Sequence, residues 1–405
     1  MNSNALKPLN NEPSEGFSHS VSLFRLFGIE VRLDFSVLII FMLIVFSLGS
    51  GIFAHWHPDW SNLTIWGVAL SAGVLFFVSL LAHEFAHSMV SQYYGIPVPR
   101  ITLFLFGGMA QISEEPHRPK EEFWIAIAGP LMSIFISLVC TNLALWNVDE
   151  VFLAELATET PEAMSRLGPV QTALFWLGSV NMLLAVFNMI PGFPMDGGRV
   201  FRAAVWAITG DRIKATRWAS NGGRYFGWSL MAFGVLGLFG GAGIGSLWWI
   251  LIGWFISSLA AMSYRQLIMD NKLKDFVVAD LMHTQFDVVA AETALPDFVE
   301  QQLLHGSQQF WPVMSGSSLA GIVTLLEIAR MPEDARPGKS VGDVMRPLDS
   351  VTVLSPDTRM LNALESLSRA GDEPALVLEK GKLVGMIRNA DVMQWMLLHG
   401  GIQSK

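Results

Sequence analysis

The sequence has little charge and a single cysteine. Only 15% of its 405 residues are Asp, Glu, Lys or Arg, whereas soluble domains have about 25%, and 52% are hydrophobic. This composition excludes a single soluble domain and predicts a membrane protein. Because Cys140 has no second cysteine to pair with, an intramolecular disulfide is excluded. The opening 20 residues contain no apolar stretch behind a basic start, so we expect no cleaved signal peptide.

Charge is absent altogether from five long runs of the sequence. A helix needs about 20 apolar residues to cross a bilayer, so each of the first four runs predicts one membrane span. The fifth run is 40 residues long and has a cluster of glycines near its middle, which predicts two helices joined by a tight turn. We therefore expect six spans, within the runs 35–54, 61–82, 123–148, 167–195 and 225–264.

Lys and Arg gather in the loops on one side of these spans. If the N-terminus is cytoplasmic, the basic residues of the short loops all lie inside except Arg166. Cytoplasmic loops carry the excess of Lys and Arg in membrane proteins, so we expect both termini in the cytoplasm. The predicted location is the plasma membrane, or inner membrane, of the cell, with multiple passes.

The sequence after Lys274 changes character and repeats itself. Charges return and apolar runs shorten to strand length, with helices expected at 295–305 and 360–371 and strands at 309–314, 319–322, 375–378 and 383–387. The segment 278–282 is echoed at 341–345. A period of about 60 residues is too long for a solenoid and fits two small α/β modules packed together. This pattern resembles a tandem of cystathionine-β-synthase-type domains, called CBS domains.

The motif His83-Glu84-Phe85-Ala86-His87 indicates a metal site. On a helix, residues four apart share a face, so both imidazoles can bind one Zn²⁺ while Glu84 reaches a metal-bound water. The motif ends an apolar run, where ionisable groups are costly and usually functional. The alternative interpretation is an interfacial polar cluster that caps the helix.

A zinc site of this kind needs a third protein ligand and leaves a fourth position to water. The other histidines lie in tails, in the soluble part, in a basic loop or on the opposite side of the membrane. Asp196 is the better candidate, because it follows the fourth span in a stretch, 188–199, that prolines and glycines break at membrane depth. Such backbone is tolerated only where it lines a cavity or is buried in protein.

The segment 100–112 has β-branched and aromatic residues on either side of Gly107-Gly108. This arrangement predicts a membrane-dipping β-hairpin with its turn at the two glycines. A re-entrant plug with a purely structural role is the alternative.

Two motifs in order carry a family resemblance. The pair His83-Glu84-x-x-His87 and Asn188-x-x-Pro191-x-x-Pro194-x-Asp196-Gly197-Gly198 resembles the site-2 protease family of intramembrane metalloproteases, peptidase family M50. With a CBS tandem behind it, the chain is similar to the six-span branch of that family. The resemblance implies one Zn²⁺ per chain, held by His83, His87 and Asp196, with Glu84 as general base.

The same resemblance implies roles for two further groups of residues. Asn188 matches a polar residue near the scissile carbonyl and could donate a hydrogen bond to the developing oxyanion, although it could also only cap broken backbone. The edge of the hairpin would bind substrate as an added strand, through Gly107, Gly108, Met109, Ala110 and Gln111.

CBS tandems often bind adenine nucleotides between their repeats, where a Ser/Thr-x-x-Asp element holds the ribose. The matching positions are 324–327 and 388–391, and each copy keeps only part of the pattern. Thr324, Arg388 and Asp391 are the candidate nucleotide-binding residues, and a structural or dimerising role is the alternative.

The expected fold is a polytopic α-helical membrane protein with six transmembrane helices and a re-entrant β-hairpin, followed by an α/β tandem CBS domain. Its expected parts are a cytoplasmic segment (1–31), a zinc metalloprotease domain (32–268), a linker with the first CBS domain (269–335) and the second CBS domain with the tail (336–405).

The expected function is hydrolysis of a peptide bond in or next to a transmembrane segment of another protein, with the CBS domains regulating activity or substrate binding. The expected partners are a membrane-protein substrate and the lipid bilayer. A homodimer through the CBS domains stays open, and nucleic acid is not expected. The alternatives are a CBS-regulated ion channel or transporter that uses the His/Glu/Asp cluster as an ion site, and an inactive relative that binds membrane partners.

Overall fold

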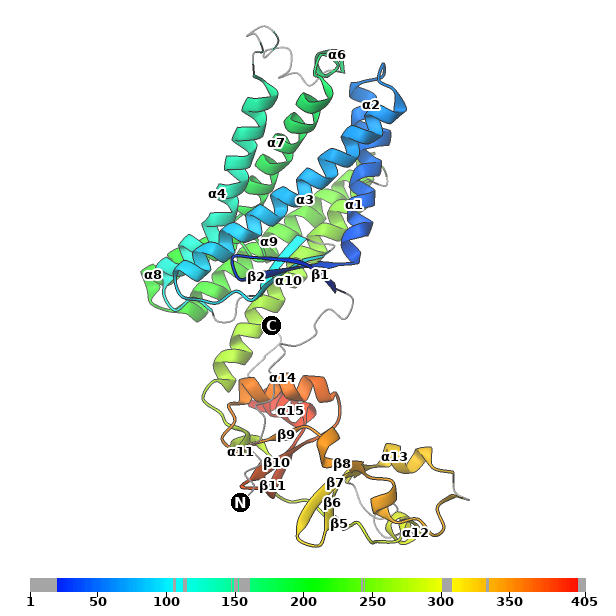
Figure 1. Ribbon diagram of the computed structural model, residues 1–405. Helices are drawn as coiled ribbons and strands as arrows, with labels where there is room; N and C mark the ends of the chain where they lie inside the picture. Colours follow the sequence, from blue (N-terminus) through cyan, green and yellow to red (C-terminus); the bar gives the residue numbers. More distant parts are fainter. Residues whose placement is uncertain are drawn as a thin grey trace. The chain divides into compact units, whose positions relative to one another are not determined.

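The protein is described by a computed structural model, which divides into two compact units, Met1–Arg265 and Gln266–Lys405 (Figure 1). The structure describes residues 20–104, 107–111, 115–146, 148, 152, 161–241, 243, 245–300, 308–332 and 335–399. Residues 301–305 of the helix expected at 295–305 lie outside these ranges.

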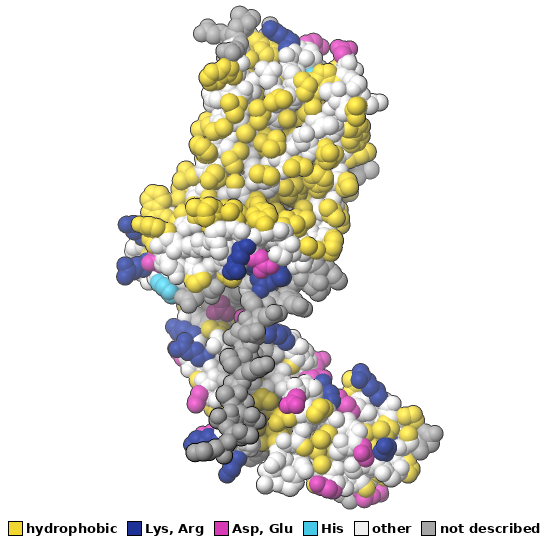
Figure 2. Space-filling view, in the orientation of Figure 1, with side chains coloured by type: hydrophobic (Ala, Val, Ile, Leu, Met, Phe, Trp, Pro, Cys, Tyr) yellow, Lys and Arg dark blue, Asp and Glu magenta, His cyan; other side chains and the backbone are white. Residues whose placement is uncertain are grey.

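Long apolar helices form most of the first unit. Among the described residues, five are long and apolar enough to cross a membrane: Ser36–Trp56, α3 (Asn62–Tyr93), α4 (Pro119–Ala144), α7 (Pro169–Asn188) and α10 (Ser246–Leu273). The first of these consists of α1 (Ser36–Ser47), a π-helical turn (Leu48–Ile52) and α2 (Phe53–Trp56). Figure 2 shows a broad zone of exposed hydrophobic side chains over this unit, with Lys and Arg along its lower edge.

The remaining expected span, fifth in chain order, corresponds to α9 (Arg212–Phe239), which is not among these five helices. Its first half carries four basic residues, Arg212, Lys214, Arg217 and Arg224, so only its second half is uniformly free of charge. A short helix, α8 (Asp196–Thr209), precedes it and ends at Gly210, which adopts φ +68°. That left-handed conformation suits glycine and closes the helix.

The helices begin where the sequence supplies a cap. The Ser61 hydroxyl accepts a hydrogen bond from the Thr64 N–H at the start of α3, and the Asp211 carboxylate accepts one from the Lys214 N–H at the start of α9. In front of α4, the Glu121 carboxylate accepts from the backbone N–H groups of His117 and Arg118.

A four-stranded sheet belongs to the first unit and includes the expected hairpin. Its order is β1 (Ser20–Leu26), β2 (Ile29–Asp34), β3 (Arg100–Phe104), β4 (Gly107–Gln111), with β2 and β3 parallel and the other pairs antiparallel. Its buried residues Ile29, Val31 and Ile101 pack against Phe85 of α3. Strands β1 and β2 were not predicted from the sequence, and the expected boundary at residue 31 falls inside β2.

The prediction of a turn at Gly107-Gly108 was wrong. Both glycines lie within β4, where Gly107 pairs with Phe104 and Gly108 with Leu103. The residues between β3 and β4, 105–106, lie outside the described residues, as does Ile112 at the end of the segment expected to form the hairpin. Gly108 is required at its place for a different reason, a close approach to α3 that is described below.

The second unit contains two similar α/β repeats. The expected strands match β6, β7, β10 and β11 to within two residues, and the helix expected at 360–371 matches α14. The first repeat consists of β5 (Val289–Ala290), α12 (Leu295–Phe298), β6 (Phe310–Ser315), β7 (Ser318–Thr324) and α13 (Leu325–Arg330), with β8 (Arg346–Pro347) completing its sheet. The second consists of β9 (Val353–Leu354), α14 (Met360–Ala370), β10 (Ala375–Glu379), β11 (Lys382–Ile387) and α15 (Asn389–His399).

The two repeats exchange the short echoed segments that precede them. Val278, from α11 (Val278–Leu281) ahead of the first repeat, is buried in the core of the second and donates its N–H to the Thr358 carbonyl at 2.9 Å. Val341, ahead of the second repeat, is buried in the core of the first and donates to the Thr293 carbonyl at 2.9 Å. Each core is therefore completed by the other repeat's segment.

Candidate metal centre

The centre joins two helices that are far apart in sequence. His83, Glu84 and His87 lie on α3, and Asp196 is the first residue of α8. A Cβ added at Gly197 would lie 2.4 Å from the Met189 carbonyl carbon, and one at Gly198 would lie 2.4 Å from the carbonyl carbon of Gly192. The two glycines after Asp196 thus let α8 start directly against the irregular chain that leads into it.

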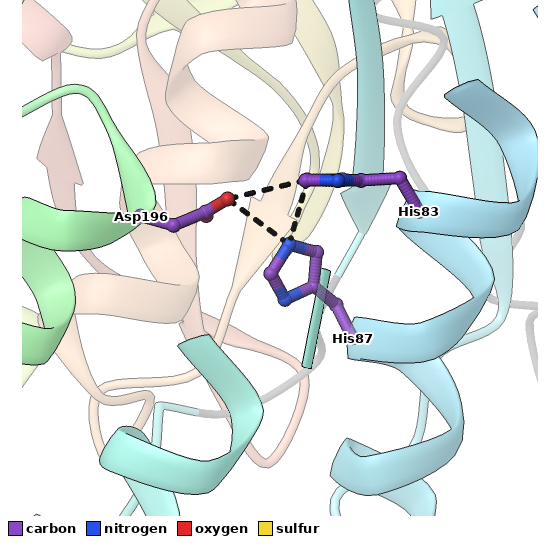
Figure 3. Close-up of side chains that lie close together, drawn as sticks. All are labelled: His83, His87 and Asp196. Atoms are coloured by element: carbon purple, nitrogen blue, oxygen red, sulfur yellow. Dashed lines mark hydrogen bonds and ion pairs between the residues drawn. The ribbon is translucent and has the colours of Figure 1, made fainter. Parts of the chain in front are cut away.

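Three ligand atoms form an equilateral triangle (Figure 3). His83 Nε2, His87 Nε2 and Asp196 Oδ2 are each 3.2 Å from the other two. Tetrahedral zinc with bonds of about 2.0 Å places neighbouring ligand atoms about 3.3 Å apart. The donor set and its spacing therefore fit one face of a zinc tetrahedron and leave the fourth position open.

Both imidazoles are oriented by α4. His83 and His87 are buried, and His87 Nδ1 donates a hydrogen bond to the Ile125 carbonyl at 2.6 Å. His83 Nδ1 pairs with the Ser133 hydroxyl at 2.9 Å. Such bonds fix the ring orientation and leave Nε2 free for a metal. Burial opposes ionisation of Asp196, but the imidazoles of His87 and His83 hold its pKa well below its usual range.

Gly129 is a site residue that the sequence analysis did not assign. A Cβ there would lie 2.1 Å from His87 Nε2 and 2.5 Å from His83 Nε2. Its neighbour Pro130 lies inside α4, in a stretch of small residues of the kind that lets two membrane helices pack closely. In the structure the contact is with the Nε2 atoms of the two imidazoles, a packing role for which the sequence carries no distinct signal.

Glu84 lies beside the sheet and outside the ligand triangle. A Cβ on Gly108 would lie 2.3 Å from Glu84 Cγ and 3.0 Å from its Oε1, so β4 passes directly over this carboxylate. In the strand order β1-β2-β3-β4, β4 is an edge strand, and Met109 on it is exposed. The structure thus brings the hairpin candidates 107–111 next to the catalytic candidate Glu84.

Asn188 is the last residue of α7 and is half-buried. Within the described part of the chain, its side chain forms no hydrogen bond, so the backbone-capping role is not seen there. The helix end is closed by the backbone N–H of Met189, which donates to the carbonyl of Ala185.

The three nucleotide-binding candidates already have side-chain partners. Thr324 caps α13 and its hydroxyl bonds to Glu327, while Arg388 pairs with Asp391 through Nη2 and Oδ1 at 2.6 Å. Burial opposes ionisation of Asp391, yet Arg388 holds the pKa of its carboxyl below the usual range. The Arg388 guanidinium also lies 5.9 Å from the ring centre of Phe310 in the first repeat.

Matching pairs of a basic side chain and a carboxylate occupy equivalent places in the two repeats. In the second, His283 Nε2 is 3.4 Å from Asp391, and in the first, Arg346 Nε is 3.4 Å from Glu327. Arg346 also reaches Glu373 of the second repeat at 2.6 Å. The acidic residue in the first turn of each closing helix is therefore contacted by the basic residue that directly follows an exchanged segment.

Comparisons with known proteins find a family match within each of the two units. Residues 71–231 match the family model "Peptidase family M50", and residues 341–398 match the model "CBS domain". Rip3 from Mycobacterium tuberculosis, whose name assigns it provisionally to the zinc metalloproteases, is 32% identical over 375 residues, 92% of each chain.

Two further similarities extend the comparison. A relative from Synechocystis, with the same provisional name, is 30% identical over 93% of this chain and 95% of its own. Among solved structures, the site-2 protease from Methanocaldococcus jannaschii is 29% identical, covering 61% of this chain and 96% of that chain with a TM-score of 0.41.

Proposed function

The chain belongs to peptidase family M50 and is an intramembrane zinc metalloprotease, and we propose that His83, His87 and Asp196 hold its zinc ion with Glu84 as general base. The observation that carries this proposal is the triangle of ligand atoms at 3.2 Å, which fits tetrahedral zinc. Glu84 lies next to the triangle without being part of it, as a base that acts on water requires. An ion carrier would not need such a non-ligand carboxylate, so the channel or transporter alternative is not favoured.

The chemistry divides between the metal and the side chains. Zinc, when bound, supplies a Lewis acid that polarises the peptide carbonyl and lowers the pKa of water to about 7. Glu84 accepts the proton of the attacking water and then delivers it to the leaving amine. Asn188, with no internal partner among the described residues, donates a hydrogen bond to the developing oxyanion. A contact of this kind contributes about 3 kcal/mol in comparable acyl-transfer sites.

The substrate binds as an added strand on β4. A transmembrane helix buries its carbonyl groups in its own hydrogen bonds, so the segment to be cut must be extended. Gly107, Gly108, Met109, Ala110 and Gln111 form an edge strand that offers backbone groups to such a segment. Because Gly108 touches Glu84, an added strand would pass beside the general base.

The membrane topology has six spans, α9 and the five long apolar helices, with both termini in the cytoplasm of a plasma-membrane protein. The support is the gathering of Lys and Arg at one edge of the apolar zone (Figure 2). In this topology α3 runs inward, and His83 and His87 lie toward its cytoplasmic end. Water reaches the site from the cytoplasm beside the irregular 189–195 segment.

The second unit is a CBS tandem that regulates activity or substrate binding, in the expected parts 269–335 and 336–405. We place an adenine nucleotide between the repeats, at Thr324, Arg388 and Asp391, and leave dimerisation through the same unit as the other role. The support is the base-and-carboxylate pair in each repeat, which a nucleotide's phosphates and ribose hydroxyls could engage in place of the internal partners.

The function is tested by comparing cells that express the wild type with cells that express Glu84→Gln. Mass spectrometry of the membrane fraction should find proteins cut in or beside transmembrane segments only with the wild type. Zinc content should be equal in the two purified proteins, because Glu84 is not a ligand. Equal amounts of the cut fragments in both strains would contradict the role of Glu84.

A further inference from the structure

A buried ion pair connects α8, which carries Asp196, to α4, which orients the two histidines. Glu122 of α4 is fully buried, and Arg202 of α8 is 7% exposed. Arg202 Nε donates to Glu122 Oε1 at 2.5 Å, and a second guanidinium nitrogen contacts the same oxygen. Among the described side chains we find no other polar link between these two helices.

The carboxylate depends on this one cation. Glu122 Oε2 has no hydrogen-bond partner among the described residues, so the buried charge is balanced at Oε1 alone. Loss of Arg202 would leave an unpaired buried charge, which is far more costly than an unpaired surface charge. The guanidinium also lies 5.1 Å from the ring centre of Phe193, in the irregular segment just before Asp196. Arg202 therefore contacts both α4 and the approach to α8.

One face of α4 contacts both histidines and is linked through Arg202 to the helix that carries Asp196. Glu122, Gly129 and Ser133 are spaced by about two and then one helical turn, so they share that face. Gly129 contacts both imidazoles, and Ser133 and the Ile125 carbonyl hold them. The histidines are thus bonded to α4 themselves. Among the described residues, the Asp196 side chain bonds only to the histidines, and it is tied to α4 through Arg202, further along its own helix.

We propose that Glu122 and Arg202 are positioning residues, whose buried ion pair sets the register of α8 against α4 and so holds Asp196 at bonding distance from zinc. The proposal rests on the ligand set given above. A shift of α8 moves Asp196 relative to His83 and His87, because a helix transmits displacement along its axis. Partners that support metal ligands in this way commonly change metal affinity by about tenfold to a hundredfold when lost.

The test measures zinc affinity of the full-length protein in detergent by competition with a chelator, together with thermal unfolding of the zinc-free protein. Arg202→Lys keeps the counter-charge but loses the planar guanidinium, so it should fold and bind zinc at least roughly tenfold more weakly. The double variant Glu122→Leu with Arg202→Met leaves no charge unpaired, so its zinc-free stability should stay close to wild type. Its zinc affinity should still be lowered, because the ion pair that sets the register of α8 against α4 is lost.

Glu115→Gln is the matched control. It breaks an exposed ion pair, Glu115 with Arg212 at 2.5 Å, in the same unit and should bind zinc as the wild type does. Wild-type zinc affinity in both Arg202→Lys and the double variant, with folded protein, would overturn the proposal. A double variant that loses stability and affinity together, while Arg202→Lys binds normally, would also overturn it. If instead wild type and Asp196→Ala bound zinc with the same affinity, the assignment of Asp196 as a zinc ligand in the proposed function would be wrong.

Discussion

Gly129→Ala tests the candidate metal centre with a single methyl group. The added Cβ would lie 2.1 Å from His87 Nε2 and 2.5 Å from His83 Nε2, whereas an ordinary contact begins at 3.4 Å. The imidazoles must retreat by about 1.3 Å, or α4 must move by as much, and a misplacement of about 1 Å can cost a factor of roughly 100 in a catalytic site. Because disturbed support of metal ligands costs about tenfold to a hundredfold in metal affinity, we expect zinc affinity to fall by about a hundredfold, equivalent to about 2.7 kcal/mol.

The assay is chelator competition on purified full-length protein, followed by cleavage of a membrane-protein substrate. Gly178→Ala is the control, because its Cβ would lie 2.4 Å from Thr141 Oγ1 at another tight contact of α4, with α7, away from the ligands. Both variants introduce one methyl into a helix contact, but only Gly129→Ala should lose zinc and activity. If Gly129→Ala bound one zinc ion with wild-type affinity, the proposed position of the metal beside α4 would be refuted.

Three further predictions address the ligands, the strand and the topology. Asp196→Ala should lose about one zinc ion per chain in metal analysis, whereas Glu84→Gln should retain it. Normal zinc content in Asp196→Ala would show that Asp196 is not the third ligand. Ala110→Pro should reduce cleavage more than Gln111→Ala at equal expression and zinc content, by roughly fivefold for one lost backbone hydrogen bond, because proline lacks the N–H. Equal cleavage by the two variants would leave the sheet with a structural role alone. A cysteine placed at Asp275 should react with an impermeant reagent only after the cells are opened, and labelling of intact cells would contradict the cytoplasmic position of the second unit.

The sequence was informative wherever one local pattern determines the structure. The four-residue spacing of His83 and His87 places both on one face of any helix, so their meeting required no knowledge of the fold. Asp196 was found because prolines and glycines break an apolar run just before it. The bilayer imposes a similarly local rule, and five of the six expected spans are long apolar helices in the structure.

The sheet was only half predictable because its central pairing is not local. The strands β3 and β4 are neighbours in sequence, but β2 pairs in parallel with β3, with Glu30 opposite Arg100 and Leu33 opposite Leu103. Parallel strands are not joined by a tight turn, so no turn residue in the sequence indicates that β2 and β3 pair. The misplaced Gly-Gly turn has a related cause: a glycine pair signals either a turn or a close approach. Here Gly108 is required by Glu84, which lies on a different element.

The support of the metal centre was harder to predict than its ligands, because α4 contributes groups without a chemical signature. A carbonyl at Ile125, a missing side chain at Gly129 and a hydroxyl at Ser133 could occur in any membrane helix. Their function follows only from the packing of α3 against α4. Glu122 alone gave a usable signal, since a carboxylate close to an apolar run needs a partner in the folded protein. That partner, Arg202, lies 80 residues away, so only the folded chain could identify it. Residues that hold a ligand in place are therefore best sought on the helix that packs against both helices carrying the ligands, rather than beside the motif.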